Sequence, residues 1–585
     1  MQLAPRAVMA ETDDGAVSRA SFAVGTVGVG DLAVTVDLDA GRLTWSLANR
    51  GDRSVRVRRV GVELSVGGTD GPLRMLRHGY QSWSPCDTAV VGVDGDPSRR
   101  AADLASFLGA YHAEQRPAGE GEIRSEWVTV LADDRSAVLL GAVGGSGHDV
   151  TFRARLEEGS TPVVSIEAVL GGARLDPAER RTLHDVRIDD DAGRADPGAA
   201  PALLEAWAAE VGAHEGARAD APYQVGWCSW YHYFNDVTAA DIDVNLAAAD
   251  DWPFDVFQVD DGYQRAIGDW LATNETFPDG LPRLARAIAA AGFRPGIWLA
   301  PFLAAPDSQV ATEHPDWFAR HASGRPLGAW FNPAWGGGQD GVMWALDTTH
   351  PEVQAHLERV ARELVALGFT YLKLDFTFAP SLDGAWYDDR ATPAERVRAG
   401  YDAVRRGAGP DAFLLGCGVP LANVVGVVDG NRIGQDVAPE WSVPPEREMV
   451  PGYLAIQPAV VSAAGNTLAR SFMHRHLWLN DPDCLMLRTE QTELTPAAMR
   501  TWAEVVAISG GMALVSDDLR LLDDDAEATL RDVIERGRAS DQRALAGSPA
   551  RCGDLVTARR PATLASGPDE LHIDLEAGTS RVTRS

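Results

Sequence analysis

The stretch PEVQAHLERVARELVALGFTYLKLDF, residues 351–376, runs from a helical segment into a short apolar strand. In a strand, residues two apart face the same side, so we expect Lys373 and Asp375 to share one face, with Leu372, Leu374 and Phe376 facing outward against helices. This unit decides the fold, because the same alternation of helix and strand recurs through the second half of the chain.

From about residue 220, short apolar strands alternate with alanine-rich helices such as LPRLARAIAAAG. Eight strand–helix units over roughly 300 residues predict a (β/α)8 TIM barrel, which we assign to residues 220–518. Acidic residues cluster where the strands end, and in such a barrel that end is the catalytic face. The predicted strands are YQVGWCSW, DVFQVDD, FRPGIWLAP, TYLKLDF, AFLLGCG, GNRIGQD, RHLWLND and MALVSDD, and the acids are Asp260, Asp261, Asp375, Asp436, Asp481 and Asp517.

Two further regions flank this barrel, as the length of 585 residues leads one to expect. Residues 1–200 read as an antiparallel β super-sandwich, with a hairpin in LAVTVDLDAGRLTWSLANR and several later segments of period-two patterning. Residues 201–219 form a helical linker, and residues 519–585 are expected to be a small β domain.

The composition limits the classes of partner. A net charge of −31 repels phosphate backbones and anionic lipid, so we expect neither nucleic-acid nor membrane binding and favour a neutral substrate. Five scattered cysteines without metal spacing indicate reduced thiols and a cytoplasmic protein, and no signal peptide or membrane helix is evident. The acidity fits either a salt-adapted or a GC-rich source.

Lys373 is the only lysine among 53 basic side chains; all the others are arginine. A cation beside Asp375 holds that carboxylate ionised, which suits a nucleophile. Lysine is a compact point charge, whereas a guanidinium is a wide planar fork that would not fit beside a bound sugar ring. The competing interpretation is a structural ion pair at the end of a strand.

Two other acidic motifs allow similar alternatives. Asp260 and Asp261 in FQVDDGYQ could accept hydrogen bonds from sugar hydroxyls, bind a metal or simply solvate a loop. Arg432 precedes Asp436 by four residues in GNRIGQD, where the alternatives are a loop salt bridge and the second carboxylate of a retaining glycosidase.

Aromatic residues lie close to the predicted strand ends. Flat rings can cover the C–H face of a sugar, although each ring taken singly is more often part of a core. The candidates are Trp230, Tyr231 and Trp298 in the barrel and Trp83 in the unusual RHGYQSWSPC segment of the β domain.

Taken together, WCSWYHYF, FQVDDGYQ, FRPGIWLAPF, HPDWF, YLKLDF, LLGCGVPL and VDGNRIGQDVAPEW resemble, in order and spacing, the α-galactosidases of glycoside hydrolase family 36, in their shorter bacterial form. The resemblance covers about residues 75–515, and the C-terminal segment does not align. It implies a retaining exo-α-galactosidase with no metal and no organic cofactor, acting on a small-molecule α-galactoside, and often homo-oligomeric.

The resemblance also assigns roles by position. Asp375 is implied to be the nucleophile and Asp436 the acid/base. Asp260, Asp261 and Lys373 are implied to hold the 4- and 6-hydroxyl region of galactose, and Cys417 and Arg432 the 2-hydroxyl side. Trp230, Tyr231, Trp298 and the β-domain residue Trp83 are implied to line the site. The alternatives are an α-N-acetylgalactosaminidase, a galactosyl-transferring enzyme or, as a different class, a non-catalytic sugar-binding protein.

Overall fold

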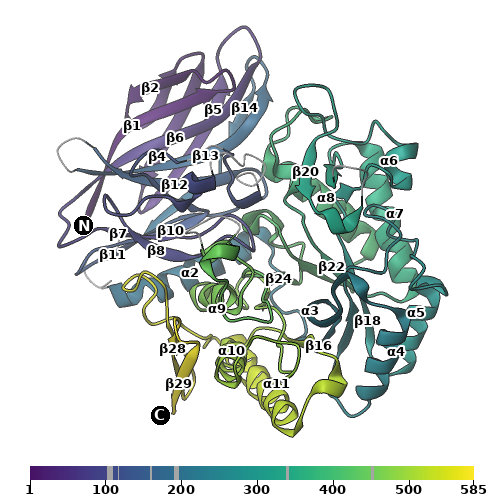
Figure 1. The fold of residues 1–585 in the computed structure, drawn as a ribbon. Coiled ribbons are helices and arrows are strands. Elements are labelled where there is room, and N and C mark those ends of the chain that lie inside the picture. The colour runs from purple at the N-terminus through teal and green to yellow at the C-terminus, as the bar shows by residue number, and fades with distance from the viewer. Residues whose placement is uncertain are drawn as a thin grey trace.

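The computed structural model describes residues 1–101, 110–115, 118–157, 161–189, 197–336, 341–448 and 454–584. Two antiparallel sheets form the N-terminal region, coloured purple to blue in Figure 1, beside a parallel barrel coloured teal to green. The prediction of an N-terminal β region, a central barrel and a small C-terminal sheet is confirmed. The predicted domain boundaries stay predictions.

The N-terminal sheets have the strand orders β2-β1-β6-β13-β12-β9 and β3-β4-β5-β15-β11-β10-β7-β8, with β14 paired to β5. The hairpin expected in residues 32–50 is β4–β5, which turns at Ala40 and Gly41, both with positive φ. The strands are β1 Gln2–Thr12, β2 Val17–Ser21, β3 Gly25–Val29, β4 Leu32–Asp39, β5 Arg42–Asn49, β6 Val55–Gly67, β7 Arg74–Arg77, β8 Asp87–Val90, β9 Ile123–Glu126, β10 Val128–Ala132, β11 Ala137–Ala142, β12 Asp149–Leu156, β13 Pro162–Leu175, β14 Arg180–Thr182 and β15 Val186–Asp189.

All eight predicted barrel strands form, and every neighbouring pair in the sheet is parallel. The ring closes where the Met512 N–H donates to the Asn480 carbonyl at 2.9 Å and where Leu485 bridges Val515. In order around the sheet the strands are β25 Leu479–Asp481, β24 Gly430–Arg432, β23 Phe413–Gly416, β22 Tyr371–Leu374, β18 Arg294–Leu299, β17 Val256–Val259, β16 Val225–Cys228 and β26 Ala513–Val515.

Helices cover most of the barrel, and their ends follow from local sequence. The helix α7 has Pro351 in its first turn, and Gly368 ends it with φ of 111°. Among the described residues, no helix combines the length and apolar character needed to cross a membrane. The helices are α2 Ala200–Glu215, α3 Trp230–Tyr233, α4 Ala239–Ala248, α5 Gly280–Ala290, α6 Gln309–Glu313, α7 Pro351–Leu367, α8 Pro393–Ala408, α9 Val460–Ala469, α10 Pro496–Ser509 and α11 Asp524–Leu545.

One strand–helix unit differs from the expectation of eight. Between β23 and β24, whose connection is fully described, the chain makes only a 3-10 turn, Leu421–Val424. The β domain occupies the place of the missing helix: the Leu421 N–H donates to the Tyr80 carbonyl at 3.0 Å, and the Asn423 amide donates to the Gly145 carbonyl at 2.9 Å. The two domains are therefore joined directly behind this part of the ring.

Two small antiparallel sheets complete the fold. One is inserted between β18 and α7, with β19 Leu303–Ala304, β20 Gly328–Phe331 and β21 Val342–Ala345. The other consists of β27 Thr563–Ser566, β28 Asp569–Asp574 and β29 Thr579–Arg584 and lies beside α10 (Figure 1). The segment after residue 518 thus does contain the expected β sheet, but it begins with the long helix α11, which packs on α10.

Candidate active site at the C-terminal end of the barrel

Asp375 directly follows β22, and its backbone N–H donates to the Leu299 carbonyl at 2.7 Å. Its carboxylate accepts two hydrogen bonds, from the Trp298 indole at 3.0 Å and from the Phe376 N–H at 2.9 Å. The residue is 7% exposed. Donors from two directions therefore fix the orientation of this carboxyl group at the end of the strand.

The expectation for Phe376 is wrong. The chain leaves the strand at this residue, whose φ of 52° is left-handed, so the alternation that would have turned it outward stops. Its ring instead packs against Trp83 at 5.0 Å and Trp335 at 4.9 Å between centroids.

Lys373 is buried and points to the same side as Asp375, as expected. Its ammonium lies 2.9 Å from Asp260, which follows β17 two strands away. Burial alone would lower the pKa of Lys373, but the charges of Asp260 and Asp375 outweigh it and raise that pKa. Lys373 is therefore a fixed cation between two carboxylates.

Asp261, the residue after Asp260, is held by neutral donors. The amides of Asn235 and Gln264 donate to it at 2.7 and 2.6 Å, and the Trp335 indole donates at 2.6 Å. Burial raises the pKa of Asp261 to about 6, although these hydrogen bonds oppose the rise.

Arg432, at the end of β24, is surrounded by carboxylates. Its guanidinium lies 2.9 Å from Asp436, 3.1 Å from Asp481 and 2.8 Å from Asp483. Loss of solvation raises the pKa of Asp436 to about 7; Arg432 and Lys373 oppose this rise, while Asp483 and Asp375 add to it. A carboxyl group that stays protonated near neutral pH can act as a proton donor.

Cys417 and Trp83 lie against this group of charges. The Cys417 thiol is fully buried, and burial together with Asp375 raises its pKa, so it stays protonated. Gly418 has φ of 54°, and a Cβ there would lie 2.7 Å from the Trp83 ring, which explains the glycine after the cysteine in LLGCG. The buried indole N–H of Trp83 has no protein partner among the described residues.

A buried arginine holds the Trp83 segment in place. Arg470, just after α9, donates to the carbonyls of Ser82 at 2.9 Å and Gly79 at 3.2 Å. It also donates to the Ile433 carbonyl at 2.8 Å, three residues before Asp436. One guanidinium thus ties the β-domain loop to the loop that carries the acidic residue.

The remaining predicted aromatic residues differ in how closely they join this site. Tyr231 is buried and its hydroxyl donates to Asp483, whereas Trp230 is half-exposed and packs its ring on Phe234. Sequence reasoning missed Trp335, from the inserted segment, and Asp483. Only the aromatic run GAWFNPAW and the acid two residues after Asp481 could have indicated them.

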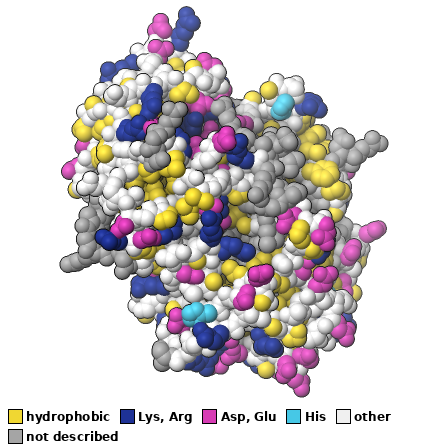
Figure 2. All heavy atoms as spheres, turned by 60° about the vertical axis from the view of Figure 1, so that its left-hand side comes forward, with side chains coloured by type: hydrophobic (Ala, Val, Ile, Leu, Met, Phe, Trp, Pro, Cys, Tyr) yellow, Lys and Arg dark blue, Asp and Glu magenta, His cyan; other side chains and the backbone are white. Residues whose placement is uncertain are grey.

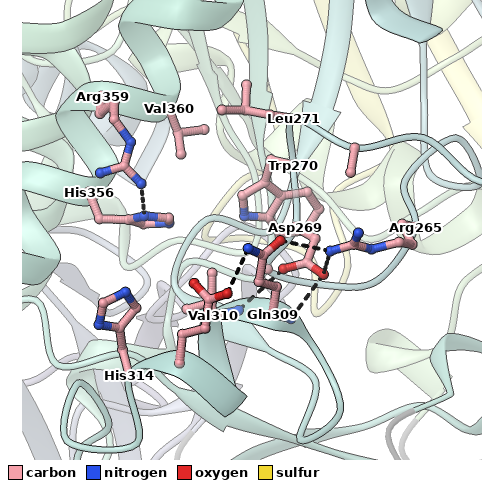
Figure 3. Close-up of a pocket in the computed structure, with 13 residues that line it drawn as sticks. Arg265, Asp269, Trp270, Leu271, Gln309, Val310, His314, His356, Arg359 and Val360 are labelled. Carbon is pink, nitrogen blue, oxygen red and sulfur yellow. Dashed lines mark hydrogen bonds and ion pairs between the residues drawn. The ribbon is translucent and has the colours of Figure 1, made fainter.

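A cavity of about 230 Å³ lies on the flank of the barrel, outside the ring of predicted site residues (Figure 3). Arg265, Asp269 and Gln309 form a hydrogen-bonded group on one side of it, and His356 and Arg359 face them from α7. Trp270 lines the cavity and packs edge-on against Trp298 at 5.7 Å. The cavity therefore lies behind the tryptophan that donates to Asp375.

Comparison with known proteins gives matches to the barrel in sequence and to nearly the whole chain in fold. The melibiase family matches residues 226–379. The α-galactosidase AgaA of Geobacillus stearothermophilus is 28% identical over 29% of this chain and 22% of its own length. The A type blood α-D-galactosamine galactosaminidase of Flavonifractor plautii is 28% identical over 34% of this chain and 20% of its own length. The chain therefore matches about a fifth of the length of these curated relatives.

Among solved structures, the α-galactosidase TtGalA of Thermus thermophilus, in complex with p-nitrophenyl α-D-galactopyranoside, superposes with a TM-score of 0.68 at 26% identity. That match covers 94% of this chain and 98% of the other. The family 36 enzyme AgaA has the same fold, with a TM-score of 0.60 at 13% identity over 97% of this chain and 79% of its own. The chain is thus similar to α-galactosidases in part of its sequence and in its fold, and it shares its fold with the family 36 enzyme AgaA.

Proposed function

We propose that this protein is a retaining exo-α-galactosidase that releases terminal α-linked galactose by double displacement. One observation carries the proposal: two carboxyl groups, those of Asp375 and Asp436, lie near one another at the C-terminal end of one barrel. Asp375 accepts two hydrogen bonds that suit an anion, whereas the pKa of Asp436 is raised to about 7, in part by Asp375 itself. The likeness to TtGalA over nearly the whole chain supports the same reaction class.

In this mechanism Asp375 attacks the anomeric carbon while protonated Asp436 donates its proton to the departing oxygen. The resulting glycosyl ester is hydrolysed by water, from which Asp436 then takes a proton. Lys373, Asp260 and Asp261 would hold the 4- and 6-hydroxyl side of galactose, and Cys417 and Arg432 the 2-hydroxyl side. Trp83, Trp230, Tyr231 and Trp298 would cover the ring.

Hydrolysis of an α-N-acetylgalactosaminide is the second candidate, because one sequence relative bears that activity in its name. A panel of p-nitrophenyl glycosides separates the two. We expect turnover of the α-galactoside well above that of the α-N-acetylgalactosaminide. The reverse preference would assign the second activity, and no turnover of any glycoside would overturn the proposal.

Substitution of Asp375 and the pH dependence of the wild-type reaction test the roles of nucleophile and acid. We expect Asp375→Ala to lower kcat/KM by on the order of 10⁴-fold, and proton NMR of the wild-type reaction to show α-galactose as the first product. Because the acid must be protonated, wild-type kcat/KM should fall as pH rises above about 7. Asp383→Ala, at an exposed carboxylate, is the matched control. Wild-type turnover by Asp375→Ala would contradict the assignment.

A further inference from the structure

Three carboxylates surround the single guanidinium of Arg432, which leaves an excess of negative charge. Asp436 and Asp483 lie 2.9 and 2.8 Å from its two terminal nitrogens, and Asp481 lies 3.1 Å from Nε. The side chains of Arg432 and Asp483 are 2% and 0% exposed. So much negative charge in so little water favours binding of a proton by one of the three acids.

The hydrogen bonds indicate which acid stays ionised. Asp483 accepts from four donors: Arg432, the Tyr231 hydroxyl, the Val437 N–H at 2.9 Å and the Cys484 N–H at 2.7 Å. Among the described residues, the carboxyl of Asp436 accepts from Arg432 alone, and it is 36% exposed. Burial raises the pKa of Asp483 as well, but its four donors occupy the lone pairs of both carboxylate oxygens, so the proton goes to Asp436.

The backbone at Asp483 supports a specific role. Its φ of 92° is unusual for a residue with a side chain, and it follows Pro482. Strained backbone of this kind persists where surrounding contacts hold it and is frequent at functional sites. Here the four donors hold it, and one of them is the N–H of Val437, the residue next to Asp436. The carboxylate is therefore pressed against the loop that carries the acid.

Building on the proposed function, we propose that Asp483 is a positioning residue whose permanent negative charge keeps the proton of the catalytic acid on Asp436 near neutral pH. Asp483 is not required to touch the sugar or to transfer a proton. The charged and titratable groups that face Asp436 are Arg432, Asp483, Asp375, Lys373, Tyr231, Cys417 and Tyr111.

The test is the pH dependence of kcat/KM of Asp483→Asn on phenyl α-galactoside, whose leaving group needs a proton. Asparagine keeps the size and tolerates positive φ but removes the charge. We expect the alkaline limb of the profile, the pH range in which kcat/KM falls as pH rises, to move to lower pH by about one unit. On a 2,4-dinitrophenyl α-galactoside, whose leaving group departs without protonation, the variant should lose much less activity at pH 8. Equal losses on both substrates would indicate a merely structural effect and overturn the inference.

Asp481→Asn is the matched control, because it removes a carboxylate from the same guanidinium. Beyond Arg432, that carboxylate accepts from the Asp483 N–H at 2.9 Å and, among the described residues, from no group of the Asp436 loop. We expect it to lower the rate at all pH values and to move the limb less than Asp483→Asn does, because the Asp481 carboxylate, within the described part of the chain, accepts no hydrogen bond from the Asp436 loop. An equal shift in both variants would overturn the specific role of Asp483.

If Asp483→Asn does not fold, as judged by its thermal transition, Tyr231→Phe serves instead. It removes one donor to Asp483 and leaves both carboxylates, so the limb should move in the same direction by a smaller amount, and an unmoved limb would contradict the inference. Failure of the proposed function is distinguishable, because the wild-type enzyme would then hydrolyse neither substrate.

Discussion

Lys373 shows how a single side chain can be fixed by the shape of its site. It is the only lysine of the chain, and its ammonium is enclosed between Asp260 and Asp375. The Trp298 indole and the Cys417 thiol lie against the same charges. A guanidinium is wider than an ammonium, and these groups leave little room for it.

We expect Lys373→Arg to lower kcat/KM on p-nitrophenyl α-galactoside by about 10²-fold or more while the fold is kept, because the wider cation would displace Asp260 or the sugar. Steady-state kinetics and circular dichroism measure the two effects. Arg362→Lys, at a 58% exposed position on α7, is the control. Near-normal turnover by the arginine variant would show that the lysine is not sterically required.

At this scale the sequence predicted the two central acids, because strand-end position and side-chain alternation are local properties. It did not predict Phe376, because a left-handed residue ends the alternation without a glycine to announce it. Asp483 and Trp335 were also missed. Asp483 contacts Arg432, which lies 51 residues earlier in the sequence, and Trp335 contacts Asp261, which lies 74 residues earlier. No local sequence pattern indicates contacts over such separations.

At the scale of elements, the loop of residues 79–84 brings Trp83 from the β domain to the barrel. Arg470 holds this loop by donating to backbone carbonyls, and burial lowers the pKa of Arg470 to about 10, so it remains charged at neutral pH. Without the guanidinium, several buried carbonyls would have no donor.

We expect Arg470→Met to lower the free energy of unfolding by about 3 kcal/mol or more, because it leaves buried carbonyls unpaired, and to raise KM through movement of Trp83. Urea unfolding and steady-state kinetics measure these effects. Arg135→Met, at an 83% exposed side chain, should change neither. A variant with unchanged stability and KM would show that the loop is held by other contacts.

All eight barrel strands could be predicted because most of them are short apolar runs that alternate with helical segments, and several end in an acid or a glycine. The missing helix after β23 could not, because its place is taken by Tyr80 and Gly145 from the β domain, and such packing between domains leaves no local signal. The helix α11 was likewise overlooked in a segment whose last strands read clearly as β.

At the scale of the whole molecule, the chain carries a net charge of −31. On the face shown in Figure 2, acidic and basic side chains are interspersed and no single basic patch dominates. Asp149 of β12 is buried at the junction of the two domains, where it accepts from the Asn423 amide at 2.9 Å. Burial raises its pKa to about 7.

A raised pKa in the folded state means that folding binds a proton between about pH 4 and pH 7, so this group's contribution to stability is lost as pH rises through that window. We expect Asp149→Asn to abolish this loss of stability at high pH, because asparagine has no proton to release. The Tm of the variant relative to wild type should be several degrees higher at pH 8 than at pH 5, measured by differential scanning calorimetry.

Asp532→Asn, at a 55% exposed carboxylate on α11, is the control and should show the same relative Tm at both pH values. If the relative Tm of Asp149→Asn were also independent of pH, the junction would not contain a proton bound on folding.

The attachment of the Trp83 loop to the barrel by Arg470 has a consequence for the engineering of this protein. A barrel excised without the β domain would lose the Trp83 loop and would leave the Arg470 guanidinium without the carbonyl acceptors of that loop. Transfer of the site to another protein would therefore require both domains, and a change in their relative orientation would move Trp83.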